Sequence, residues 1–120
     1  MKVLRVLTRI YVAPGRLDEA LTFYEQLFGQ PCRLRFDYPA VNLELAEVGS
    51  VLLLSGTDEA LRRFRPTAMT IMVDSLAEWH QALPVLGAEI TEPPKRVPTG
   101  SNMRVRHPDG TVVEYVEHHG

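Results

Sequence analysis

His107-Pro-Asp-Gly-Thr-Val-Val-Glu-Tyr-Val-Glu117 is the stretch that decides the fold. Its first residues predict a turn, because Pro108 fixes φ, Asp109 can bond its own backbone and Gly110 supplies a positive φ. The residues that follow are β-branched or aromatic and predict a strand. Side chains alternate along a strand, so Glu114 shares a face with two valines. A carboxylate among apolar side chains requires a partner, a ligand or water.

A second stretch has the same pattern. The sequence "EVGSVLLLS" at residues 47–55 also places a glycine before an apolar strand, and it aligns when Gly49 is set on Gly110, an offset of 61. The same offset sets residues 10–12 on residues 71–73. Each of these early strands precedes a helical pattern that ends at a glycine. Both halves therefore predict a strand, a helix and about three strands, which is a repeat half the chain long.

The chain is predicted to be one α+β domain of two βαβββ modules. The modules span about residues 1–56 and 67–120, with a linker at 57–66. A length of 120 residues is enough for a single core.

Prolines interrupt the second half in two places. Pro84 lies inside the second helical pattern and predicts a kink or an early end near Leu83. Residues 93–102 contain three prolines and a glycine. This segment predicts an irregular loop that covers a site as a lid or rim.

Charge and composition exclude several classes of protein. The 13 basic and 15 acidic residues give a net charge of −2, which argues against a nucleic-acid-binding face. No apolar run approaches the ~18 residues of a membrane span, and no signal-peptide pattern is present. The single cysteine, Cys32, permits no intrachain disulfide. We therefore expect a cytoplasmic protein without a nucleic-acid or membrane partner.

The paired halves resemble a known family. Together with "LDEALTFYEQLFG" at residues 17–29 and "HPDGTVVEYVE" at residues 107–117, they are similar to the vicinal oxygen chelate superfamily. That superfamily includes glyoxalase I, bleomycin-resistance proteins and extradiol dioxygenases, and the resemblance covers essentially the whole chain. It implies that each half curls its strands into a cup around a site, and that two chains form a homodimer.

The resemblance also implies where a metal would bind. Metal-dependent members place histidine on the first strands and glutamate or histidine on the last strands. These positions fall on Leu7, Ala68, Leu53 and Glu114, of which only Glu114 can bind a metal. A catalytic zinc ion needs about three protein ligands. No histidine precedes His80, so we expect a protein that uses no metal and no other cofactor.

Strand parity predicts the lining of the cup, which is mostly apolar with a few polar points, as is typical of a small-molecule pocket. The predicted ligand-binding residues are Arg9, Tyr11, Leu53, Thr70, Met72, Arg104 and Glu114. Val51 is expected on the same face, and the facing of Arg104 is left open. Arg9 and Glu114 either pair with each other to support the sheet or bind polar groups of a ligand.

Three functions remain open. The first is metal-independent binding, or sequestration, of a small apolar or amphipathic organic molecule, as in the bleomycin-resistance branch. The alternative is an enzyme of the same superfamily, of lyase, isomerase or dioxygenase type. It would use Glu114 as general base with Arg9 at the oxyanion, or a metal held by ligands that the sequence does not reveal. The third is a dimerisation or accessory module in which Arg9 and Glu114 are structural.

Overall fold

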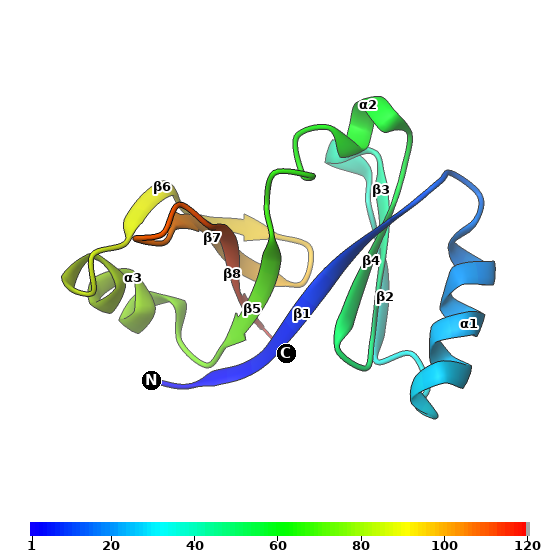
Figure 1. The fold of residues 1–120 in the computed structure, drawn as a ribbon, viewed down its shortest axis with the longest axis horizontal. Helices are drawn as coiled ribbons and strands as arrows, with labels where there is room; N and C mark the ends of the chain where they lie inside the picture. The colour runs from blue at the N-terminus through cyan, green and yellow to red at the C-terminus, as the bar shows by residue number, and fades with distance from the viewer. Residues whose placement is uncertain (120) are drawn as a thin grey trace. The chain divides into compact units, whose positions relative to one another are not determined.

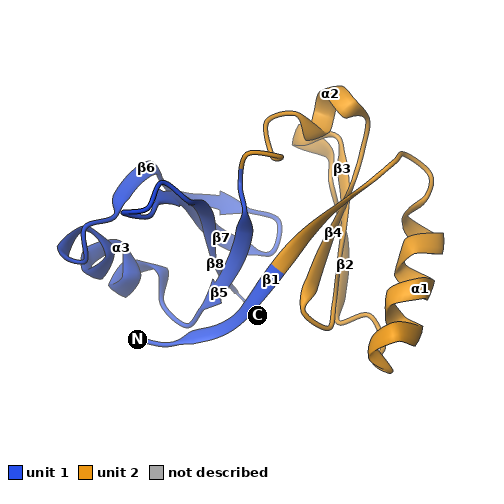
Figure 2. Ribbon diagram, in the orientation of Figure 1, with its two compact units in different colours: residues 1–7, 67–120 blue, residues 8–66 orange. Residues whose placement is uncertain are grey.

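The structure, a computed structural model, describes residues 1–119 (Figure 1). Contacts divide it into two compact units, unit 1 with residues 1–7 and 67–120 and unit 2 with residues 8–66 (Figure 2). The elements in chain order are β1 (Val3–Val12), α1 (Leu17–Phe28), β2 (Leu34–Tyr38), the 3₁₀ helix η1 (Pro39–Val41), β3 (Leu43–Val48), β4 (Val51–Ser55), α2 (Asp58–Leu61), β5 (Met69–Val73), α3 (Leu76–Val85), β6 (Glu89–Val97), β7 (Gly100–Arg106) and β8 (Val112–His118). None of the helices in residues 1–119 has the length and apolar character needed to cross a membrane.

Unit 2 is a four-stranded sheet with α1 packed on one face. The strand order is β2-β3-β4-β1, with β1 parallel to β4 and the other neighbours antiparallel. Leu17 and Leu21 of α1 are buried against Val12 and Ala46 of the strands. The helix ends as predicted at Gly29, whose φ of 64° is left-handed.

Unit 1 repeats this plan with β5, β8, β7 and β6 in that order, and with α3 on one face. Strand β5 is parallel to β8, and the remaining pairs are antiparallel. Residues 1–7 also belong to this unit, and just before β1 the carbonyl of Lys2 accepts from the amide of Asp74 at 3.2 Å. Helix α3 contains Pro84 and ends at Val85, two residues beyond the predicted Leu83.

The predicted fold class is confirmed. Each half has the order strand, helix and three strands, β1-α1-β2-β3-β4 in the first and β5-α3-β6-β7-β8 in the second. By contact, residues 1–7 group with the second half, and residues 57–66 group with the first.

The prediction of an irregular loop at residues 93–102 is wrong, because this segment belongs to the β6–β7 hairpin. β6 is the edge strand of unit 1, and its pairing with β7 shifts register between Glu92 and Lys95. Pro93 and Pro94 lie in that shift, where the ladder requires no amide donor. Prolines therefore interrupt the ladder locally without preventing the strand.

Candidate functional site

Each unit has a helix face, which its helix covers, and an opposite face. In unit 1 the helix-face core includes Ile71, Val113 and Tyr115, packed under α3. Side chains alternate along strands, so Thr70 and Glu114 point to the opposite face. Glu114 therefore lies on the same face as Val112 and Val116, as predicted, and not on the face that α3 covers.

Four polar residues lie side by side across the opposite face of unit 1. Thr70, Glu114, Arg104 and Glu92 are successive partners on β5, β8, β7 and β6. We call these four residues the polar row. Directly opposed side chains in a sheet have Cβ atoms within about 5.5 Å, so neighbouring members of this row, such as Glu114 and Arg104, can interact with the same small molecule. Thr70, at its inner end, is only 2% exposed.

Arg104 is the cation of the polar row. Its Nη1 donates to Oε1 of Glu92 at 3.0 Å, and Lys95 Nζ lies 4.0 Å from the same carboxylate. The Arg104 side chain is 21% exposed. Its Nε is buried and has no hydrogen-bond partner within residues 1–119. Arg104 lies between Glu92 and Glu114, which answers the open question of its facing, and its partly exposed guanidinium has further N–H donors besides the one bound to Glu92.

Apolar side chains flank the polar row. Met72 and Val116 lie on the same face one step along β5 and β8, and Val112 lies on the other side of Glu114. Asn102, opposite Val116, is a further buried polar residue. A charged row between apolar side chains can fix the polar end of a small molecule and hold its apolar part.

Unit 1 thus brings together four of the predicted ligand-binding residues, Thr70, Met72, Arg104 and Glu114. Arg9 and Tyr11 belong to unit 2, where the Tyr11 hydroxyl donates to the carbonyl of Phe64 at 2.8 Å. The pairing of Arg9 with Glu114 stays a prediction.

The predicted facing of Leu53 and Val51 is wrong. Both belong to the helix-face core of unit 2 with Leu17 and Leu21, and Leu53 is 0% exposed. Leu53 therefore fills the core beneath α1 and does not line the opposite face.

A difference of register explains this error. β1 and β5 align at the offset of 61, which sets Ile10 on Ile71. In the sheet, however, Ile10 is paired with Leu53 and Ile71 is paired with Tyr115. The last strands of the two halves, β4 and β8, therefore align at an offset of 62. Because the side-chain period of a strand is two, a shift of one residue exchanges the faces. The residue of unit 2 that corresponds to the carboxylate of the polar row is therefore Leu52.

The side chains present do not fit the metal that the family resemblance implies. Leu7, Ala68 and either Leu52 or Leu53 have no donor atoms in their side chains. Within residues 1–119, no group of three or more His, Cys, Asp or Glu side chains is arranged to hold a metal ion. Glu114 alone falls short of the three or so ligands of a catalytic zinc site.

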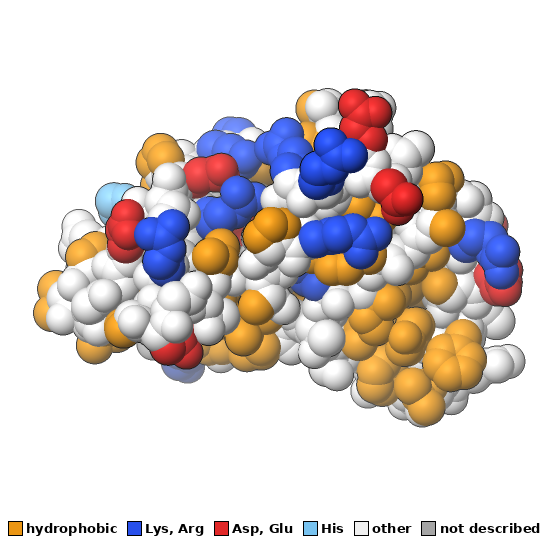
Figure 3. Space-filling model, turned by 45° about the horizontal axis from the view of Figure 1, so that its top comes forward, with side chains coloured by type: hydrophobic (Ala, Val, Ile, Leu, Met, Phe, Trp, Pro, Cys, Tyr) orange, Lys and Arg blue, Asp and Glu red, His pale blue; other side chains and the backbone are white. Residues whose placement is uncertain are grey.

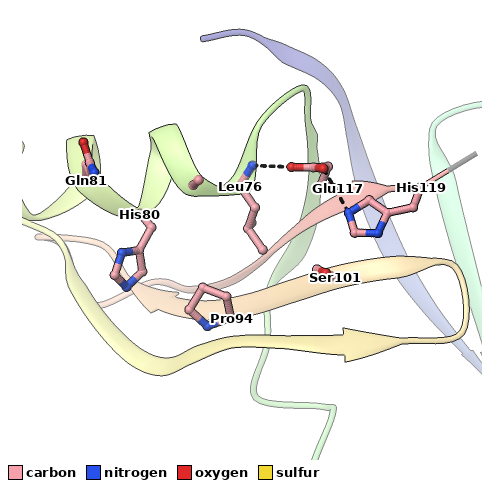
Figure 4. A pocket seen from close by; sticks show the side chains of 8 residues that line it. Leu76, His80, Gln81, Pro94, Ser101, Glu117 and His119 are labelled. Atoms are coloured by element: carbon pink, nitrogen blue, oxygen red, sulfur yellow. Dashed lines mark hydrogen bonds and ion pairs between the residues drawn. The ribbon is translucent and has the colours of Figure 1, made fainter.

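Sequence reasoning missed a pocket of about 380 Å³ beside α3 (Figure 4). His80 lies on its helical wall, and Glu117 and His119 lie at its other end. Glu117 accepts from the amide of Leu76 at 2.7 Å and lies 3.0 Å from His119 Nε2. The signal was present, because alternation from Tyr115 puts residues 117 and 119 on the helix face.

Comparison with protein families agrees with this architecture. Residues 6–115 match the model of the Glyoxalase/Bleomycin resistance protein/Dioxygenase superfamily. The match spans both units, and the chain belongs to this superfamily.

Solved structures show the same fold. An uncharacterized protein from Methanosarcina mazei is 50% identical with a TM-score of 0.90, covering 99% of this chain and 95% of that one. Methylmalonyl-CoA epimerase from Mycobacterium tuberculosis is 17% identical with a TM-score of 0.67, covering 100% and 94%. The Streptomyces coelicolor epimerase (Q60A), in complex with 2-nitronate-propionyl-CoA, is 16% identical with a TM-score of 0.67, covering 99% and 100%. At such identities the two epimerases support the fold alone. A search among curated proteins finds no match.

Proposed function

We propose that this protein binds a small amphipathic organic molecule on the opposite face of unit 1, without a metal ion and without changing the molecule chemically. The polar row carries the proposal. Glu114 would accept from a cationic or donor group of the ligand, and the partly exposed guanidinium of Arg104 would donate to an acceptor.

Two further observations support this function. Val112 is partly exposed beside Glu114, and Met72 and Val116 are buried on the same face, so the surroundings of Glu114 are apolar and suit the body of an amphipathic molecule. Leucine and alanine side chains occupy the positions where metal-dependent relatives would have ligands, so binding would depend on contacts with the organic molecule itself.

A screen of amphipathic amines and their neutral isosteres tests the proposal. Binding is measured by calorimetry on the wild-type protein and on Glu114→Gln. The amide keeps the shape but loses the charge, so affinity for a cationic ligand should fall by at least about tenfold. Circular dichroism of each variant shows whether the fold is retained.

Glu89→Gln is the matched control. Glu89 lies on β6 and pairs with Arg106 at 2.8 Å, both side chains being well exposed. Its substitution removes the same charge from the same sheet and should leave affinity within about twofold, as is usual for an exposed ion pair. Equal losses in the two variants, or an unchanged affinity in Glu114→Gln, would remove the polar row from the binding site.

A second candidate function is metal-free proton transfer, favoured by the direct opposition of Glu114 and Arg104. The carboxylate would take a proton from a carbon acid, Arg104 would stabilise the oxyanion formed, and the proton would return from Glu114 to carbon. Nuclear magnetic resonance can follow exchange of the substrate's α-hydrogen for solvent deuterium with a panel of thioesters and 2-oxo acids. Exchange that disappears in Glu114→Gln would support catalysis, and no exchange would support binding only.

We also propose the homodimer that the family resemblance implies. Phe23 and Leu27 form an exposed apolar pair on α1, and apolar surface of this kind is common where subunits meet. Light scattering after gel filtration measures the molar mass, and the mass of a single chain would contradict the proposal.

A further inference from the structure

A cavity of about 430 Å³ lies in unit 2 where the end of β1 meets α2. Tyr11 and Ala13 line it from β1 and the turn that follows, and Thr57, Leu61 and Arg65 line it from α2 and its flanks. Its volume is within the range of about 300–1,000 Å³ that is usual for small-molecule sites. The cavity shares no residue with the polar row.

The aromatic wall of this cavity is fixed in place. The hydroxyl of Tyr11 donates to the carbonyl of Phe64 at 2.8 Å, and the side chains of Leu61 and Phe64 are buried. The guanidinium of Arg65 lies over the Tyr11 ring, with Cζ 5.0 Å from the ring centroid. This cation–π contact holds the guanidinium beside the cavity, and arginine N–H groups are well suited to bind oxyanions.

The donors of Arg65 are not saturated by the described protein. The carboxylate of Asp58 is 3.7 Å from Nη2, which is too long for a hydrogen bond, and the Arg65 side chain is itself half exposed. Asp58 is 99% exposed and therefore hydrated. Residues 58–65 contain three arginines against two acids, and Figure 3 shows basic side chains on the part of unit 2 that carries α2.

We propose that this cavity binds a small organic oxyanion, a carboxylate or phosphate monoester with a compact apolar body. The anionic group would accept from the N–H edge of Arg65, and the body would lie against Tyr11, Ala13 and Leu61. This site goes beyond the function proposed for unit 1, since it takes ligands of the opposite charge on different residues.

Titration of benzoate and of phenyl phosphate into ¹⁵N-labelled protein tests the site. Saturable shifts are expected for the amides of Gly56 and Thr57 and for the Arg65 Nε–H signal. Arg65→Gln should weaken binding by at least about tenfold, because charge-assisted hydrogen bonds are lost. Arg62→Gln, which removes the same charge from an exposed neighbouring side chain, should keep the wild-type affinity.

Ala13→Leu provides a second arm that leaves every charge in place. The larger side chain should fill the cavity and weaken binding of both probes, while the spectrum keeps its dispersion. Stronger binding of one probe would assign the ligand class as carboxylate or phosphate. Equal losses in Arg65→Gln and Arg62→Gln, full binding in Ala13→Leu, or no shift at Gly56 and Thr57 in the wild-type protein would each overturn the proposal.

Discussion

The β3–β4 turn and the β7–β8 turn are the two regions that the glycine alignment treats as equal, and they differ in length. In unit 2, Val48 pairs with Val51, so Gly49 and Ser50 form a two-residue turn. In unit 1, Arg106 pairs with Val112, so residues 107–111 form a loop of five residues. The aligned glycines therefore precede strands whose faces are exchanged.

Each turn uses its glycine differently. Gly49 has a φ of 55°, as a two-residue hairpin of this kind requires, and it lies against the ring of Phe28. In the longer loop, the amide of Thr111 donates to Asp109 Oδ1 at 2.9 Å and the amide of Gly110 donates to the carbonyl of His107 at 2.9 Å. The comparison teaches that a shared glycine marks a turn but does not specify the register after it.

The largest expected effect tests the exchanged face directly. Leu53→Ala should lower the free energy of unfolding by about 2–5 kcal/mol, because it opens a cavity beneath α1. Urea denaturation measures the loss. Leu86→Ala, just after α3, is the matched control, since Leu86 is 66% exposed and its truncation should change stability by less than about 1 kcal/mol. A similarly small loss of unfolding free energy in both variants would mean that Leu53 lies on the opposite face of the sheet.

The next effect compares the two glycines. A Cβ at Gly49 would lie 2.5 Å from Phe28 Cδ2, whereas one at Gly110 has no neighbour within 4 Å. Gly110→Ala should cost about 1 kcal/mol from its positive φ alone. Gly49→Ala should cost about 2–4 kcal/mol, because displacement of the ring adds to the strain. Thermal and urea unfolding measure the stability of both variants. Equal losses of stability would mean that the Phe28 ring moves aside without an energetic penalty.

Short sequence patterns correctly predicted the features that depend only on residues close together in the chain. The span of α1 follows from its apolar periodicity and Gly29, and the facing of Glu114 follows from alternation next to Tyr115. The pairing of Ile10 with Leu53 joins strands far apart in sequence, and no local pattern specifies it. The sequence therefore predicted the order of elements better than the register between them.

The candidate site was predicted in part for the same reason. Thr70, Met72 and Glu114 follow from parity within their own strands, but the position of Arg104 between Glu92 and Glu114 depends on how β7 pairs with both neighbours. The prolines of β6 concealed that hairpin, because their effect on a strand depends on whether the strand is at an edge.

The smallest expected effect concerns the Asp109 carboxylate of the longer turn. The backbone amide of Thr111, which donates to it, is the main cause that lowers the pKa of Asp109 below its usual 3.8. A group whose pKa is lower in the folded state stabilises the protein above the unfolded pKa, and this contribution is lost as pH falls through the folded pKa. Asp109→Asn keeps the acceptor oxygen but not the charge. The stability advantage of the wild-type protein over this variant should therefore be present at pH 7 and shrink below about pH 4.

Urea denaturation of both proteins across that pH range measures the difference, with Asp37→Asn to account for the loss of a negative charge from an exposed aspartate elsewhere. The shorter turn has no equivalent of this dependence, because Val48 precedes its glycine and is buried in the core of unit 2. If the free energies of unfolding of wild type and Asp109→Asn differed by the same amount at all pH values, the Thr111 amide would bind the neutral oxygen as well as the charged one. The pH dependence would then give no distinction between the two turns, and only their lengths would separate them.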